Sequence, residues 1–139
     1  MPSRLKHPQI GRVIDANYNR AKEGLRVCED IFRFLRDDPK VTARFKKIRH
    51  GVTAAAAGFG LKDMAAARDI TGDVGRATIG RKSRRDGVGD IYYANAQRVK
   101  ESLRVLEEFA KLKDARVAAG FKKLRYAVYD IEKETLGKI

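Results

Sequence analysis

Residues 17–30 read NYNRAKEGLRVCED, and this stretch decides the fold because it sets polar residues within an apolar helical stripe. At about 100° per residue, the helix around it gathers its apolar side chains on one side. Asn17 and Arg20 fall within that stripe, and Glu23 lies at its edge. Burying a guanidinium and an amide costs several kcal/mol unless both find partners or a ligand. The apolar stripe consists of Ile14, Ala21, Gly24, Val27, Cys28, Ile31 and Leu35.

The same stretch recurs 78 residues later, where Asn95–Glu108 shares eight of its fourteen residues. A second match, with five identities in eight residues, pairs Phe45–Val52 with Phe121–Val128 at an offset of 76 residues. Matches of this kind mark a repeated supersecondary unit. We therefore expect one helical hairpin used twice, over residues 12–60 and 91–136, in a four-helix bundle with approximate two-fold symmetry.

The rest of the pattern predicts an all-α fold in a single domain of residues 1–139. Asp38 followed by Pro39 is a good helix start, and Asp90 and Asp114 are expected to cap two later helices. Five glycines and no sustained apolar period predict a long loop over residues 68–90. The helices are expected at about 12–35, 39–58, 91–112 and 115–136, with a short helical piece at 61–67.

The net charge of +13 indicates anionic partners, although a solvated basic surface explains it equally well. No apolar run approaches the roughly 20 residues that a membrane span needs. Residues 1–10 are expected to form a loose leader without the apolar core of a signal peptide, so we expect a cytoplasmic chain. The one cysteine, Cys28, sits on the apolar stripe, and we interpret it as a buried thiol rather than a nucleophile.

The second helix of each repeat also carries an arginine close to its apolar face. Arg49 lies beside Phe45, Ile48 and Val52, and Arg125 occupies the matching position in the second repeat. One interpretation is a buried polar network that sets helix register. The other is a central cavity in which arginines bind phosphate oxygens, favoured by an excess of interior arginine over interior carboxylate. The candidate binding residues are Asn17, Arg20, Glu23, Arg49, Asn95, Arg98, Glu101 and Arg125.

The loop contains a second candidate group, with Arg68, Asp69 and Asp73 as candidate catalytic residues and Gly75 as a candidate phosphate-binding residue. Two carboxylates on a glycine-containing loop are suited to holding Mg²⁺ beside a nucleotide, and either one suits a base acting on a hydroxyl. The alternative is a turn in which the aspartates accept hydrogen bonds from backbone amides.

These motifs together resemble a known family. The run from Asp15 to Val27, the pair Ala67-Arg-Asp69 and Gly72-Asp-Val-Gly75, and the run from Ala94 to Glu108 carry the resemblance. They look like the helical domain found fused ahead of some bacterial thiamine-phosphate synthases and also found free-standing. The resemblance covers about residues 10–135.

The resemblance implies an alternative hydroxymethylpyrimidine phosphate kinase, which uses ATP and Mg²⁺ to add a second phosphoryl group to the thiamine pyrimidine precursor. Asn17 and Asn95 would then hydrogen-bond the pyrimidine, the arginines would bind phosphates, and Asp69 or Asp73 would act as Mg²⁺ ligand or base. The resemblance also implies that such a chain can carry the name thiamine-phosphate pyrophosphorylase after its fusion partner. That synthase is a TIM barrel of roughly 250 residues, 200 at the least, which a helical chain of 139 residues cannot contain.

Two other function classes stay open from the sequence. One is a non-catalytic domain that binds a phosphate ester and partners a separately encoded thiamine-phosphate synthase. The other is a small nucleic-acid binder driven by the positive charge, which leaves the arginines and asparagines of the apolar stripe unexplained. We expect no membrane association, and we expect a homodimer because bundles with an incomplete interior commonly pair.

Overall fold

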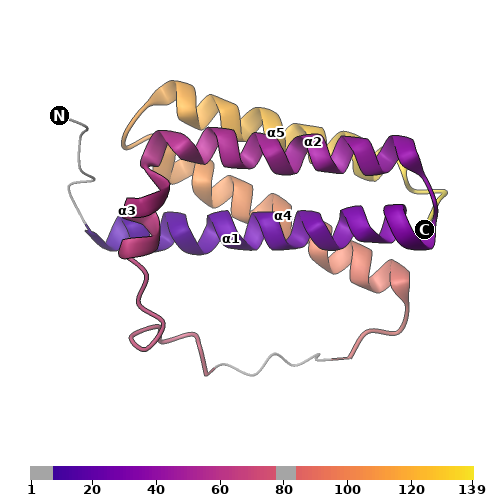
Figure 1. The fold of residues 1–139 in the computed structure, drawn as a ribbon, viewed down its shortest axis with the longest axis horizontal. Coiled ribbons are helices and arrows are strands. Elements are labelled where there is room, and N and C mark those ends of the chain that lie inside the picture. Colours follow the sequence, from indigo (N-terminus) through magenta and orange to yellow (C-terminus); the bar gives the residue numbers. More distant parts are fainter. Residues whose placement is uncertain (1–7, 78–83) are drawn as a thin grey trace.

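In a computed structural model that describes residues 8–77 and 84–139, the described chain is helical and contains no strand (Figure 1). This confirms the all-α class. A short helix, α3 (Leu61–Ala66), separates the two pairs of long helices. The long helices are α1 (Pro8–Asp30), α2 (Pro39–Ala56), α4 (Val88–Ala110) and α5 (Ala115–Glu134).

Two of the three expected helix caps form. The Asp38 carboxylate accepts a hydrogen bond from the backbone N–H of Val41 at 3.0 Å, at the start of α2. Asp114 accepts from the N–H of Arg116 at 2.8 Å and so begins α5. The expectation for Asp90 is wrong, because α4 begins at Val88, directly after Gly87 and three residues before the expected start at residue 91. Asp90 instead lies in the first turn of α4, where a negative charge is favourable.

The connection from α1 to α2 is a tight turn. The helix continues beyond Asp30 as a π-helical segment, Ile31–Leu35, and then stops at Asp37, whose φ of 49° is left-handed. The wider π turn rotates the last residues off the α-helical stripe. Leu35, expected in the core, is therefore 56% exposed, whereas Phe32 is fully buried.

The long helices pack around one core. α1 packs against both α2 and α4, and α5 packs against both α4 and α2. Figure 1 shows α2 and α5 on one side of the bundle and α1 and α4 on the other. The two-fold relation between the halves stays a prediction.

Gly24 permits a close approach between α1 and α4. A Cβ placed on Gly24 of α1 would lie 2.7 Å from Cγ2 of Val99 and 3.0 Å from the carbonyl oxygen of Asn95, both on α4. Real Cβ atoms essentially never approach other atoms below 3.0 Å. Glycine at this position therefore permits the α1–α4 contact.

Aromatic rings fill the two ends of the core. Phe32 stacks on Phe45 with ring centroids 5.8 Å apart, and Tyr92 meets both rings edge-on. The buried hydroxyls of Tyr92 and Thr135 share a hydrogen bond of 2.8 Å. Phe59 stacks on Phe121 elsewhere in the core, with a centroid distance of 6.0 Å. Cys28 is fully buried, in agreement with its interpretation as an inert thiol.

Part of the sequence-based picture lies outside the described residues. Residues 1–7 of the expected leader and residues 78–83 of the expected loop belong to that part. From Pro8 the supposed leader is already α1. No described helix combines the length and apolar character needed to cross a bilayer. The cytoplasmic location stays a prediction.

Candidate functional site

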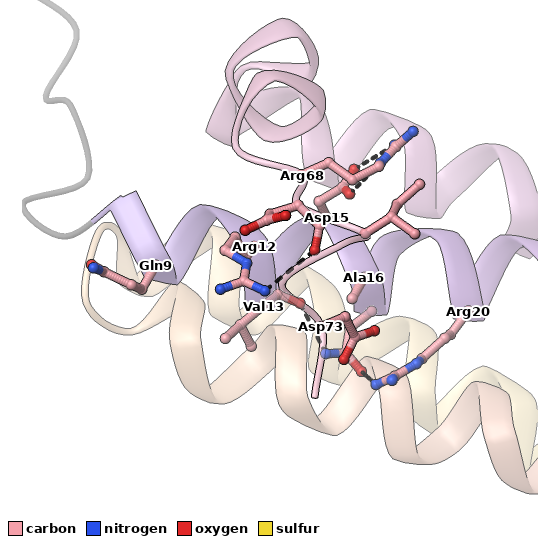
Figure 2. Close-up of a pocket in the computed structure, with 11 residues that line it drawn as sticks. Gln9, Arg12, Val13, Asp15, Ala16, Arg20, Arg68 and Asp73 are labelled. Atoms are coloured by element: carbon pink, nitrogen blue, oxygen red, sulfur yellow. Dashed lines mark hydrogen bonds and ion pairs between the residues drawn. The ribbon is translucent and has the colours of Figure 1, made fainter. Parts of the chain in front are cut away.

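The segment after α3 runs beside α1, on the side of the bundle away from α2 and α5 (Figure 1). Between this segment and α1 lies an open pocket of about 460 Å³. Figure 2 shows Arg12, Arg20 and Asp73 around the same opening. We call it the first pocket, and its polar lining residues are Gln9, Arg12, Asp15, Asn17, Arg20, Arg68, Asp69 and Asp73.

Two arginines of α1 point into the first pocket, and neither has a carboxylate partner among the described residues. Arg12 donates a long hydrogen bond of 3.4 Å to the backbone carbonyl of Asp69. Arg20 donates to the side-chain oxygen of Asn17 at 3.5 Å. Asn17 is buried, and its amide nitrogen donates to the carbonyl of Val13 at 2.9 Å. Both guanidinium groups therefore retain donors for an anion.

A bidentate ion pair attaches the segment to α1. Nε and Nη2 of Arg68 donate to the two carboxylate oxygens of Asp15 at 2.7 and 2.8 Å. Asp15 is buried, and these hydrogen bonds raise the pKa of Arg68. Arg68 was predicted as a catalytic residue. Two of its nitrogens instead form the hydrogen bonds that hold the segment after α3 against α1.

Asp69 and Asp73 adopt the turn geometry that was the alternative to a metal site. Asp69 accepts a hydrogen bond from the N–H of Gly72 at 2.8 Å, and Asp73 accepts from the N–H of Gly75 at 2.9 Å. Each bond uses one oxygen, so the second oxygen of each carboxylate carries no hydrogen bond from a described residue. Among residues 8–77 and 84–139, no three His, Cys, Asp or Glu side chains cluster as a metal site. Mg²⁺ bound with phosphates needs only one or two carboxylates, so these residues fit that use.

A second pocket, of about 490 Å³, lies further along the same face. It brings together four predicted residues, Glu23 of α1 and Asn95, Arg98 and Glu101 of α4. Arg98 is exposed and has no ion pair with a described residue. Asn95 donates to the carbonyl of Ile91 at 2.8 Å, as its repeat counterpart Asn17 does to Val13. Glu23 follows Arg20 by one helical turn, so the first and second pockets are neighbours along α1.

Arg49 and Arg125 line neither of these pockets, although Arg125 lines an adjoining hollow together with Glu101 and Tyr129. Arg49 donates to the two oxygens of Glu29 at 3.1 and 3.4 Å, and Arg125 donates twice to Glu107, at 3.0 and 3.3 Å. Glu29 and Glu107 are buried, and the bond to Glu107 raises the pKa of Arg125. At these two positions the structure has the buried polar network, the alternative to the ligand cavity.

The expected central cavity is therefore wrong in its placement. Arg20, Glu23, Arg98 and Glu101 are exposed on the α1–α4 face rather than turned into the bundle. Long side chains at the edge of an apolar stripe reach solvent while their Cα atoms stay near the core. The expected excess of interior arginines over interior carboxylates is also wrong. The buried carboxylates of Glu29 and Glu107 neutralise Arg49 and Arg125. The binding roles of the predicted residues stay predictions.

Four residues of these clusters were missed from the sequence. Glu29 and Glu107 are identical in the two repeats, and that recurrence was the available signal. Asp15 follows the core residue Ile14, and Arg12 lies one helical turn before Asp15. The sequence around these two residues gives no sign that distinguishes them from ordinary charged residues on the surface. Gly75, a predicted binding residue, lines neither pocket and donates its N–H to Asp73.

Comparison with known proteins covers nearly the whole chain. Residues 12–134 match the model of the ThiD2 family. A thiamine-phosphate synthase of Synechocystis sp. is 42% identical over 129 residues, which are 92% of this chain and 36% of the relative. Synthases of Nostoc punctiforme and Rhodopirellula baltica are 36% and 38% identical, over 92% and 85% of this chain and 36% and 32% of their own lengths. The chain thus spans about a third of these relatives, and no solved structure matches it.

Proposed function

The chain belongs to the ThiD2 family, and from that premise we propose that it serves thiamine biosynthesis by binding a phosphate ester on the α1–α4 face. In this role it is a non-catalytic partner of the part of thiamine-phosphate synthase that lies outside the match. The names of the relatives support the pathway. The ligand expected in the first pocket is the phosphorylated pyrimidine precursor.

One observation carries the proposal. Arg12, Arg20 and Arg98 line the two neighbouring pockets, and none forms an ion pair with a residue that the structure describes. By contrast, Arg49, Arg125 and the pocket residue Arg68 are neutralised by carboxylates. Each hydrogen bond between a guanidinium and a phosphate contributes about 1.5–3 kcal/mol. Three unneutralised guanidinium groups on one face therefore favour an anionic ligand.

A second candidate function is ATP-dependent phosphorylation of hydroxymethylpyrimidine phosphate. It is favoured by the carboxylates of Asp69 and Asp73 beside the arginines of the first pocket. A phosphate oxygen of the pyrimidine ester would attack the γ-phosphorus of ATP, and the bond to the leaving ADP would break. Phosphoryl transfer depends mainly on positioning and charge neutralisation. Bound Mg²⁺ would supply part of that neutralisation, with Asp69 and Asp73 as its protein ligands.

The arrangement of the pockets suits two ligands. The first pocket would hold the pyrimidine phosphate between Arg12 and Arg20, and the second would hold the nucleotide phosphates at Arg98. The amide nitrogen of Asn17 donates to the carbonyl of Val13, and its side-chain oxygen accepts from Arg20. That oxygen is therefore the group of Asn17 that would accept a hydrogen bond from an amine of the pyrimidine.

Calorimetry and ³¹P NMR on the same sample test both functions. The chain is titrated with hydroxymethylpyrimidine phosphate, with the unphosphorylated pyrimidine as control, and is then incubated with ATP and Mg²⁺. The partner function predicts binding of the ester alone and no diphosphate, whereas the kinase function predicts the diphosphate and ADP. Absence of both binding and product at high protein concentration would exclude the two functions together.

A further inference from the structure

The opposite side of the bundle carries a groove that neither function uses. It lies between α2 and α5, on the side away from α1, α4 and the segment after α3 (Figure 1). Its volume is about 500 Å³. Its floor is apolar and consists of Ile48, Gly51, Ala55, Gly120, Leu124 and Ala127.

The rim of this groove is basic on both sides. The rim consists of Arg44 and Lys47 of α2 and Lys123 of α5. No carboxylate of the described residues lines the groove. Arg44 forms an ion pair with Glu134. Lys47 and Lys123 are exposed, and neither forms an ion pair within the described part of the chain. The two lysines therefore leave a positive charge on either side of an apolar floor.

The internal repeat explains why the two walls are alike. Lys47 and Ile48 of α2 correspond to Lys123 and Leu124 of α5 at the offset of 76 residues. The same charge and the same apolar step thus recur on both walls. An occupant must present apolar groups at its centre and negative charge along both flanks.

We propose that this α2–α5 groove docks an amphipathic helix of a partner protein, with apolar residues on the docking face and acidic residues on both flanks. A helix laid between two helices covers an apolar floor of this kind, and its flanking carboxylates meet the lysines. The chain spans about a third of its curated relatives, so further polypeptide accompanies this domain there. Docking on this face leaves the two pockets of the α1–α4 face open.

Two other occupants fit less well. A second copy of this chain, paired through the same groove, would bring Lys47 and Lys123 against their own equivalents, and like charges in contact are unfavourable. A nucleic acid would neutralise the lysines, but its phosphates would leave Leu124 and Ile48 without an apolar partner.

The test uses the full ¹⁵N-labelled chain and two synthetic helical peptides. Both peptides carry leucine and alanine on one face; one has glutamate on both flanks and the other has lysine. The glutamate peptide should shift the amide signals of Gly51, Ala55 and Leu124, and the lysine peptide should shift none of them. The double variant Lys47→Glu/Lys123→Glu should bind the glutamate peptide about tenfold more weakly and should gain affinity for the lysine peptide.

A matched control lies one residue away on each helix. Lys46→Glu/Lys122→Glu makes the same change in net charge, but neither lysine lines the groove. This control should bind the glutamate peptide as the unaltered chain does. Equal weakening by both double variants, or shifts confined to other surfaces, would overturn the proposal. So would a dimer sealed through the groove, or displacement of the peptide by duplex DNA. Binding of the pyrimidine phosphate should be unchanged in both variants, which separates this result from the proposed function.

Discussion

Arg20 and Arg49 occupy comparable sites on their helices, yet the fold uses them differently. Arg49 pairs with the buried carboxylate of Glu29, whereas the hydrogen bond of Arg20 within the described part of the chain is a 3.5 Å contact with the amide oxygen of Asn17. The difference follows from the neighbouring helix: α2 brings Arg49 against α1, while Arg20 faces an open pocket. Arg49 therefore stabilises the fold, whereas the guanidinium of Arg20 remains available to bind a ligand.

Removing Arg20 or Arg98 should therefore weaken ligand binding without loss of stability. Arg20→Ala and Arg98→Ala each remove an exposed guanidinium, so the affinity for the phosphate ester should fall about 10- to 100-fold, the equivalent of one charged hydrogen bond. Calorimetry measures the affinity and a thermal melt measures stability. Arg116→Ala, an exposed arginine at the start of α5, is the control. A lowered melting temperature with unchanged affinity would contradict the assignment.

Removing Arg49 should lower the stability of the fold and leave the affinity for the ligand unchanged. The side chain of Glu29 is 2% exposed, so Arg49→Ala leaves a buried carboxylate with only the half-exposed Arg26 as partner. The free energy of unfolding should fall by about 3 kcal/mol. Urea unfolding followed by circular dichroism measures it.

Arg26→Ala is the matched control, because removal of an exposed partner should cost under about 1 kcal/mol. The apolar double change Glu29→Leu/Arg49→Met should recover most of the loss. If Arg49→Ala unfolds at the same urea concentration as the unaltered chain, the pair contributes no stability.

At the scale of elements, the contact between α1 and α4 positions the candidate site. It places Glu23 of α1 in one pocket with Asn95, Arg98 and Glu101 of α4. Gly24, next to Glu23, permits that contact. The segment after α3 is held against α1 by the Arg68–Asp15 pair, and so Asp69 and Asp73 face the arginines of α1.

Gly24→Ala should destabilise the chain although alanine is the better helix former. The added Cβ would meet the Asn95 backbone and Val99, and overpacking of this kind costs about 1–3 kcal/mol, more than the gain of up to about 1 kcal/mol in helix propensity. Gly120→Ala is the control, since nothing lies within 4 Å of its Cβ position and α5 should be stabilised. Thermal unfolding of both variants measures the two effects. A stabilised Gly24→Ala variant would show that the helices separate easily.

At the scale of the whole molecule, the closed core predicts a decline in stability at alkaline pH. Burial, with a contribution from the charge of Glu132, raises the pKa of Cys28 from 9.0 to about 12. Burial likewise raises the pKa of Tyr92 from 10.0 to about 12, partly offset by its hydrogen bond to Thr135. At a pH between the ordinary and the raised pKa, Cys28 and Tyr92 stay protonated in the folded state and lose their protons in the unfolded chain. The free energy of unfolding should therefore fall as the pH rises above about 9.

A comparison with Cys28→Ala isolates the contribution of the thiol. Above about pH 9 the unaltered chain should lose about 1.4 kcal/mol per pH unit relative to Cys28→Ala, until the folded thiol itself ionises. Urea unfolding at a series of pH values measures this slope. Parallel pH profiles for the two proteins would show that Cys28 ionises equally in both states.

The sequence by itself determined the helical content, the approximate ends of the helices and the recurrence of one polar pattern. Apolar period, helix caps such as Asp38 and Asp114, and identity between repeats are local properties that a single chain displays. Local properties also identified part of the lining of the two pockets, including Asn17, Arg20, Asn95 and Arg98, but not Arg12 or Asp15. They did not distinguish Asp90 from Gly87 as the start of α4, because two acceptable starts lie within one turn.

Only the tertiary structure decided which charge each arginine meets. Arg49 with Glu29, Arg125 with Glu107 and Arg68 with Asp15 are pairs between elements, separated by 18 to 53 residues. The free energy of a buried charge depends on the partner that packing brings to it, and periodicity along one helix does not contain that information. Packing therefore places the predicted residues around two open pockets instead of a central cavity, one between α1 and the segment after α3 and one between α1 and α4.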